Sequence, residues 1–221
     1  MSEFLTTMRR TAIRYLRQGG RTRTDDYVHR QRQGDQPEGQ WAFIHINKCG
    51  GTSVEHALNI PKIHDTAQQR RDLLGADRWA ALRSFSIVRH PYERVRSLYK
   101  YRIKTAQTGL EDAHIGLDDW IAKVFDARDP AYHDKPLMFL PARDWLTDEN
   151  DRVIVDTVVK LETIDADWPK IQEIVGTDVA LPKKNTSAPS GTGAAAAMSP
   201  DSMRILQHYF AADFDSFGYN A

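Results

Sequence analysis

A short apolar run leads directly into a pair of glycines near residue 50. The run at residues 41–46 is bounded by turn-forming residues, which is typical of a strand buried inside a sheet. Residues 47–53 supply a tight turn, and residues 54–58 have helical character. A strand, a glycine loop and a helix in this order predict an α/β fold in which the helix packs back on a parallel sheet.

The same alternation continues toward the C-terminus. Apolar runs predict two more buried strands, at residues 84–89 and 153–159. Helices are predicted at residues 66–82, 91–105 and 165–175. Ser199 and Pro200 predict the start of a last helix, as N-cap and first helical residue. We therefore expect a mostly parallel central sheet flanked by helices, with residues 41–221 as one domain.

The first forty residues differ from the rest. Up to Gln36 they contain eight arginines and four acidic residues, with apolar side chains near helical spacing. We expect a basic amphipathic helix and a linker over residues 1–40. This arm could lie on the domain, act as a mitochondrial transit peptide, or tether the protein to an anionic membrane surface or a nucleic acid.

Composition excludes several classes of protein. Lys and Arg together number 30, as do Asp and Glu, so the formal net charge is zero, which argues against a general nucleic-acid-binding surface. The single cysteine rules out an internal disulfide scaffold. Apolar runs are too short to span a bilayer, and the N-terminus lacks the apolar stretch of a secretory signal. We expect a cytoplasmic protein without a transmembrane segment.

The loop at residues 48–53 has the chemistry of an anion-binding site. Two adjacent glycines allow the backbone to turn close to a ligand, and the first N–H groups of the following helix carry partial positive charge. Polar side chains in the loop come from Lys48, Thr52 and Ser53. Because the lysine precedes the glycines, this is not the G-x-x-x-x-G-K-[ST] loop of nucleoside triphosphatases.

A second candidate anion site follows the strand predicted at residues 84–89. Arg89 ends that strand, and Ser97 lies eight residues later in the next helix, so both can face the same side. Either residue alone is unremarkable, because an arginine at a strand end usually forms a surface salt bridge. The two candidate sites together are stronger evidence for an anionic ligand than either site alone.

At this point the sequence resembles a known family. Residues 43–53, F-I-H-I-N-K-C-G-G-T-S, resemble the 5′-phosphosulfate loop of sulfotransferases, above all the carbohydrate-type family with its H-I-P-K-T-G-G-T-S pattern. Residues 86–99 resemble that family's 3′-phosphate motif, R-x-P-x-x-R-x-x-S-x-Y. Weaker matches follow at 160–162, 181–185 and 214–219. The departures from the family pattern are Asn47, Cys49, Ala142 and Lys160.

The resemblance implies a fold like that of nucleotide kinases. It also implies transfer of a sulfuryl group from 3′-phosphoadenosine 5′-phosphosulfate to an acceptor hydroxyl, expected on a sugar. Lys48 would contact the phosphosulfate and stabilise the leaving oxygen. The other implied donor-binding residues are Cys49, Gly50, Gly51, Thr52 and Ser53 for the 5′ group, Arg89 and Ser97 for the 3′-phosphate, and Lys183, Lys184 and Thr186 for closure over the nucleotide.

Removal of the hydroxyl proton calls for a general base, which is worth about 10²–10⁴ in rate. His64 is our leading candidate, because it follows the first helix where a second parallel strand is expected to end, and related carbohydrate sulfotransferases place a histidine in this stretch. Glu55 and Asp65 are the alternatives. His45 is expected to pack on the strand face or to support the site, and His90 to be structural. No histidine pair has metal-ligand spacing, so we expect no metal.

Two other functions stay open on the sequence alone. One is a kinase-like enzyme that uses the loop for a nucleoside triphosphate, and the other is a non-catalytic nucleotide-binding module. No clear sequence motif indicates the acceptor, whose contacts are expected between residues 105 and 145. Aromatic side chains available there or nearby for stacking on a sugar ring are Tyr101, Trp120, Tyr132, His133 and Trp145.

Overall fold

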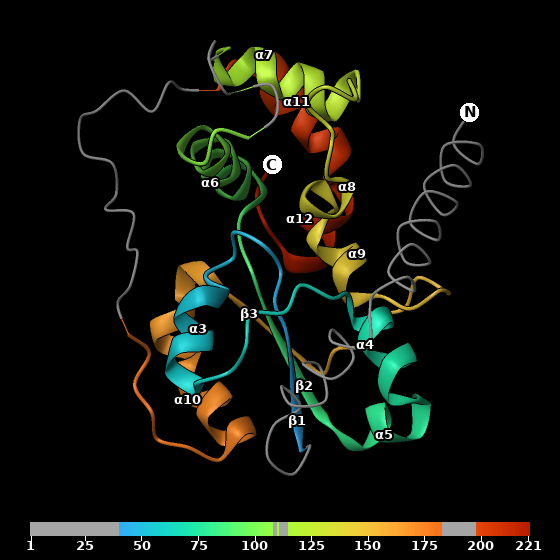
Figure 1. Cartoon of the computed structure of the whole chain (residues 1–221), viewed down its shortest axis with the longest axis vertical. Coiled ribbons are helices and arrows are strands. Elements are labelled where there is room, and N and C mark those ends of the chain that lie inside the picture. Colours follow the sequence, from blue (N-terminus) through green and yellow to red (C-terminus); the bar gives the residue numbers. More distant parts are fainter. Residues whose placement is uncertain (1–39, 108–109, 111–114, 183–197) are drawn as a thin grey trace. The chain divides into compact units, whose positions relative to one another are not determined.

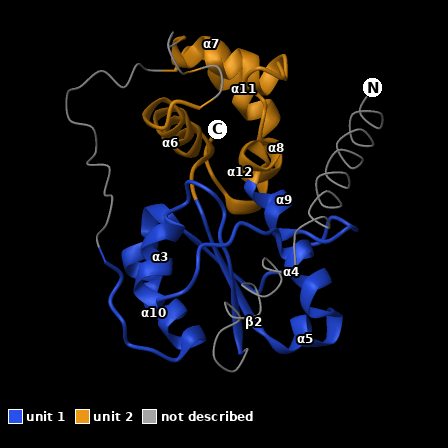
Figure 2. Ribbon diagram, in the orientation of Figure 1, with its two compact units in different colours: residues 1–88, 142–182 blue, residues 89–141, 183–221 orange. Residues whose placement is uncertain are grey.

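The computed structural model describes residues 40–107, 110, 115–182 and 198–221. The chain divides into two compact units (Figure 2): the first holds the described residues up to 88 and residues 142–182, and the second holds those of 89–141 and 198–221. Each unit has its own hydrophobic core.

A three-stranded parallel sheet forms the centre of the first unit. Its strands are β1 (Trp41–Ile44), β2 (Arg83–Val88) and β3 (Thr157–Lys160), in the order β1-β2-β3. Phe43 lies opposite Phe85, and their rings stack with centroids 5.0 Å apart. The parallel sheet predicted from the apolar runs is thus confirmed.

Helices cover both faces of this sheet (Figure 1). On one face lie α3 (Gly51–Leu58) and α10 (Ile164–Val175), the latter following the short helix η3 (Leu161–Thr163). On the other face lie α4 (Ala67–Leu74) and α5 (Ala76–Ala81), with α9 (Ala142–Leu146) in contact with α4. The buried core between the sheet and the α3–α10 layer consists of Val54, Phe85, Ile87, Val159, Trp168, Ile171 and Ile174.

Three boundaries differ from the predictions. The helix predicted at 66–82 is broken at Gly75, whose φ of 90° lies outside helical space. The strand predicted at 153–159 begins only at Thr157, because Val153 instead forms an antiparallel bridge with Thr147. The prediction of a second parallel strand that ends near His64 is wrong. Residues 60–66 are irregular, and β1 is the edge strand of the described sheet.

The second unit is helical in its described part. It contains α6 (Pro91–Lys104), α7 (Leu117–Ile121), the π-helix η2 (Ala122–Asp126), α8 (Pro136–Phe139), α11 (Pro200–Tyr209) and α12 (Ala211–Phe217). Ser199 caps α11 as predicted, its hydroxyl accepting a hydrogen bond from the Ser202 N–H at 3.1 Å. The largest fully buried apolar side chains of this unit are Trp120, Phe139 and Phe210.

Several expectations lie outside the described residues: the basic helix at 1–40, apart from Gln40, and the donor-closing residues Lys183, Lys184 and Thr186. Among the helices that the structure describes, none has the length and apolar character that a membrane span requires.

Candidate active site

The glycine loop leaves β1 and turns sharply into α3. Lys48 and Gly50 both have left-handed backbone conformations, with φ of 65° and 83°. Gly50 is the N-cap of α3 and offers no side chain, so no side-chain hydrogen bond caps the first turn. In this turn the Ser53 N–H donates to the Gly50 carbonyl at 3.0 Å, and the helix dipole favours an anion at this end of α3. Thr52, in the first turn, is exposed.

Both glycines of the loop are required by their neighbours. A Cβ atom built on Gly50 would lie 2.6 Å from Cδ1 of Leu161, and the positive φ of this residue disfavours any side chain. A Cβ atom built on Gly51 would overlap the imidazole ring of His45. The loop backbone is therefore packed directly against side chains from the end of β1 and from η3.

The two positions where the loop departs from the family pattern face inward. Asn47 is 6% exposed and Cys49 is 1% exposed, whereas Lys48 between them is partly exposed. Cys49 is thus a buried residue of the turn rather than a thiol displayed to solvent. Its predicted donor contact could involve only the main chain, because its side chain is enclosed by protein.

His64 lies against the end of β1 although no strand carries it there. Asn59 ends α3 in a left-handed conformation, and the irregular segment after it reaches the N-terminus of α4, where Thr66 and Gln69 form a capping box. On this segment, Nδ1 of His64 donates to the main-chain carbonyl of His45 at 3.0 Å. A carbonyl oxygen can only accept, so neutral His64 carries its proton on Nδ1, and Nε2 is left with a lone pair.

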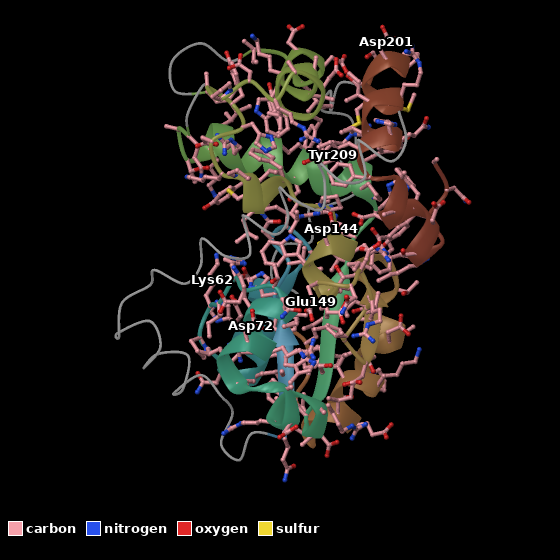
Figure 3. All side chains as sticks on the ribbon, turned by 90° about the vertical axis from the view of Figure 1, so that its right-hand side faces the viewer. Lys62, Asp72, Asp144, Glu149, Asp201 and Tyr209 are labelled. Carbon is pink, nitrogen blue, oxygen red and sulfur yellow. The ribbon has the colours of Figure 1, made fainter. Side chains whose placement is uncertain are left out.

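The surroundings of His64 favour its neutral form. Burial lowers the pKa of His64 to about 4, and electrostatic interactions with His45 and Lys62 act in the same direction. Lys62 is labelled on this segment in Figure 3. The hydrogen bond to His45 and the Glu55 carboxylate act in the opposite direction without reversing the shift. At neutral pH the imidazole of His64 is therefore unprotonated, as a general base must be.

His45 and Glu55 form a buried pair that the sequence did not reveal. Nδ1 of His45 lies 2.5 Å from Oε1 of Glu55, and the two residues are 4% and 7% exposed. The His45 ring stacks on Phe43, as expected for packing on the strand face, and its centroid is also 4.3 Å from that of His64. Since α3 carries Glu55, only the turn at the glycines brings the pair together. Glu55 is thus committed to His45, which argues against it as the base.

The predicted 3′-phosphate residues both belong to the second unit. Arg89 lies just before His90, the N-cap of α6, and is 3.8 Å from Glu93 in the first turn of that helix. Ser97 is partly exposed in the second turn of the same helix. Glu93 also accepts a hydrogen bond from Arg96 at 2.7 Å, so Arg89 shares its acidic neighbour with a second arginine.

The remaining residues of that motif hold α6 in place. Arg94 is buried, and its guanidinium donates to the main-chain carbonyl of Leu140 at 2.8 Å. The Tyr99 hydroxyl donates to the carbonyl of Ile115 at 2.6 Å. His90 caps α6 through the Tyr92 N–H and donates from Nε2 to the carbonyl of Asn220, which confirms its structural role. The motif therefore combines helix anchoring with the two residues predicted to bind phosphate.

The aromatic residues considered for a sugar ring separate into two groups. Trp120 and Trp145 are 0% and 1% exposed and belong to the interior. His133 packs against Phe139 with ring centroids 4.8 Å apart, and it donates from Nδ1 to the carbonyl of Val124 at 3.0 Å. Tyr101 is 36% exposed, and Tyr132 is partly exposed beside Lys123. The two tyrosines and the partly exposed His133 keep surface available for an acceptor.

A comparison with protein-family models agrees with the sequence resemblance. A family model described as "Sulfotransferase family" matches residues 36–220. Among solved structures, the chain is similar to a sulfotransferase from Alicyclobacillus acidocaldarius, with 14% identity over 82% of this chain and 96% of that one, and a TM-score of 0.46. A search of curated proteins finds no significant match. In the described ranges, His, Cys, Asp and Glu side chains form no group of three or more that could hold a metal ion.

Proposed function

The chain belongs to the sulfotransferase family, and on this premise we propose that it moves a sulfuryl group from 3′-phosphoadenosine 5′-phosphosulfate to a hydroxyl of a carbohydrate. The observation that carries the proposal is the pairing of two features at the end of β1. One is the uncapped N-terminus of α3 beside Lys48, which suits an anion, and the other is a neutral histidine next to it in the fold.

The 5′ end of the donor is assigned to the glycine loop. The N–H groups at the start of α3 and the hydroxyls of Thr52 and Ser53 would surround the phosphosulfate. Lys48 would place a full positive charge near the bridging oxygen, where negative charge develops as the donor is cleaved. One well-placed donor of this kind is worth about 3–4 kcal/mol in the transition state.

The 3′-phosphate is assigned to Arg89 and Ser97. An arginine binds phosphate through two parallel N–H groups, and a serine hydroxyl adds a further donor. The roles of both residues, and of Lys183, Lys184 and Thr186 over the nucleotide, rest on the motif resemblance.

His64 is assigned as the general base. Nε2 would accept the proton of the acceptor hydroxyl as the acceptor oxygen bonds to sulfur and the bond from sulfur to the 5′-phosphate oxygen breaks. The products are the sulfate ester, adenosine 3′,5′-bisphosphate and a proton held on His64. A base with a pKa of about 4 is weak, but a negatively charged donor nearby would stabilise the imidazolium and raise that pKa. The carbohydrate class of acceptor rests on the resemblance to carbohydrate-type enzymes.

Ligand-dependent thermal unfolding tests the donor assignment. Adenosine 3′,5′-bisphosphate at about 100 times its Kd should stabilise the protein by about 2.7 kcal/mol, a rise in Tm of about 5–10 °C for a chain of this size. ATP should produce little change. Lys48→Met should reduce the shift, whereas Lys104→Met, at an exposed lysine at the end of α6, should not. Equal shifts with both nucleotides would favour a kinase-like enzyme, and no shift with either would refute the donor assignment.

A further inference from the structure

The His45 side chain touches both parts of the proposed site in the first unit. On one side its ring occupies the space that a side chain at Gly51 would need, so it lies against the glycine loop. On the other side its ring centroid is 4.3 Å from that of His64. Its main-chain carbonyl, in addition, accepts the Nδ1 hydrogen bond of His64. A single residue thus contacts the loop and the candidate base.

Glu55 fixes the direction of that side chain. Its carboxylate lies 2.5 Å from Nδ1 of His45, and both groups are almost fully buried. Glu55 belongs to α3, the helix whose N-terminus completes the loop. The orientation of His45 is therefore tied to the same helix that would bind the anion. Because Nδ1 is occupied by Glu55, and the ring is covered by Phe43, Gly51 and His64, His45 is poorly placed to take a proton from an acceptor itself.

We propose that His45, held by Glu55, is a positioning residue that sets the place of His64 relative to the phosphosulfate loop. This inference rests on the proposed sulfotransferase function of the same site. The ring acts as a spacer between Gly51 and His64, and the carbonyl of the same residue holds His64 in the tautomer with a free Nε2. Trp145 contacts the His64 ring edge-on, with centroids 6.4 Å apart, and limits its movement.

The charge environment of His64 gives the proposal a readout that does not depend on activity. The charged groups that act on His64 are His45, Lys62 and Glu55. Replacing His45 by glutamine loosens the packing around His64 and removes a titratable side chain that lowers its pKa, so the pKa of His64 should move up from about 4 toward its ordinary value of 6.5. Titration of the His64 imidazole by NMR measures this directly. The matched control is His56→Gln, an exposed histidine next to Glu55 on α3.

Kinetics separate positioning from simple loss of structure. In His45→Gln we expect kcat to fall about 100-fold, the effect of displacing a reacting group, here the His64 imidazole, by about 1 Å. The Kd of adenosine 3′,5′-bisphosphate should change by less than about threefold. Glu55→Gln keeps an acceptor for His45 and should retain most of the kcat that Glu55→Ala loses. His56→Gln should behave like the wild type in every measurement.

The two proposals fail in different ways. A wild type that neither binds the bisphosphate nor transfers sulfate would refute the proposed function, while a raised His64 pKa in His45→Gln would still establish the link between the two histidines. An unchanged His64 titration in His45→Gln would overturn the positioning role, even if Tm falls. Equal losses of kcat in Glu55→Gln and Glu55→Ala would overturn the role of Glu55. If Glu55→Ala does not fold, the His45→Gln titration alone decides.

Discussion

The imidazole of His64 donates from Nδ1 to the main-chain carbonyl of His45 at 3.0 Å. These residues lie 19 positions apart, and between them the chain forms the glycine loop and the whole of α3. The contact orients the candidate base and leaves its other ring nitrogen available. It also joins the base to the loop that we propose for the donor, because the His45 ring rests against Gly51.

The pKa of His64 predicts an unusual pH profile. Since this pKa is lowered to about 4, the imidazole of the free enzyme is unprotonated above that pH and becomes protonated only below it. The acid limb of kcat/KM, which reports ionisations of the free enzyme, should therefore fall near pH 4 rather than near 6.5. In His64→Asn, turnover should drop by about 10²–10⁴ and the residual rate should lose this limb. A limb centred at 6.5 in the wild type, or unchanged turnover in the variant, would remove His64 as the base.

Gly51→Ala should weaken donor binding through a steric effect. The added methyl group would overlap the His45 ring, so either the ring or the start of α3 must move. We expect the affinity for adenosine 3′,5′-bisphosphate, measured by calorimetry, to fall at least about tenfold, which corresponds to about 1.4 kcal/mol. Gly116→Ala is the control, because a Cβ atom there would meet only Asp119, at 3.9 Å. Equal affinities in the wild type and Gly51→Ala would place the anion elsewhere.

Arg89→Ala should abolish the preference for a 3′-phosphate. A charge-assisted hydrogen bond contributes about 1.5–3 kcal/mol, so the wild type should bind adenosine 3′,5′-bisphosphate at least about tenfold more tightly than adenosine 5′-monophosphate. In the variant the two Kd values should become similar. Arg96→Ala controls for the shared partner, because Arg96 also pairs with Glu93. Survival of the preference in Arg89→Ala would show that another residue binds the 3′-phosphate.

Asp118 should stabilise the second unit at neutral pH. Its Oδ1 accepts hydrogen bonds from the Ser202 hydroxyl at 2.6 Å and the Ser199 N–H at 3.0 Å, at the N-terminus of α11. Asp118→Ala should lower the free energy of unfolding by about 1–3 kcal/mol, whereas Asp119→Ala, at an exposed neighbour, should have little effect.

The same aspartate predicts a pH dependence with a definite sign. The Ser202 hydroxyl and the Ser199 N–H lower the pKa of Asp118 below its ordinary value of 3.8. The unfolded chain therefore takes up this proton first, and the stabilisation is complete above pH 3.8 and lost as the pH falls through the lower folded value. Urea unfolding of wild type and Asp118→Ala at pH 7 and pH 3 measures this, and a difference in stability that stays constant between the two would contradict it.

The sheet could be predicted because its strands are short segments rich in apolar residues. Residues 84–88 are all buried, and residues 41–44 are buried or partly buried, so their composition alone indicates β1 and β2. The late start of β3 could not be predicted, because Val153 has the apolar character of a strand but pairs with Thr147 and is 46% exposed. The break at Gly75 had a visible signal, since a glycine within a helical pattern often ends a helix.

The candidate site was only partly accessible from the sequence. The glycine loop was recognisable from its residue types, because Gly50 and Gly51 permit a turn that few other residues allow. His64 was selected for a wrong local reason, a strand that does not exist, and its actual place depends on the reversal at Asn59 and the Thr66 cap. The pairing of His45 with Glu55 depends on how α3 packs on β1, which local propensity does not encode.

Transfer of labelled sulfate from 3′-phosphoadenosine 5′-[³⁵S]phosphosulfate to a panel of sugars tests the central claim most directly. The account predicts a labelled sulfate ester with at least one sugar, strongly reduced in Lys48→Met and His64→Asn and unchanged in Lys104→Met. Binding of adenosine 3′,5′-bisphosphate without a labelled product from any hydroxyl acceptor would contradict the account and favour a non-catalytic nucleotide-binding module.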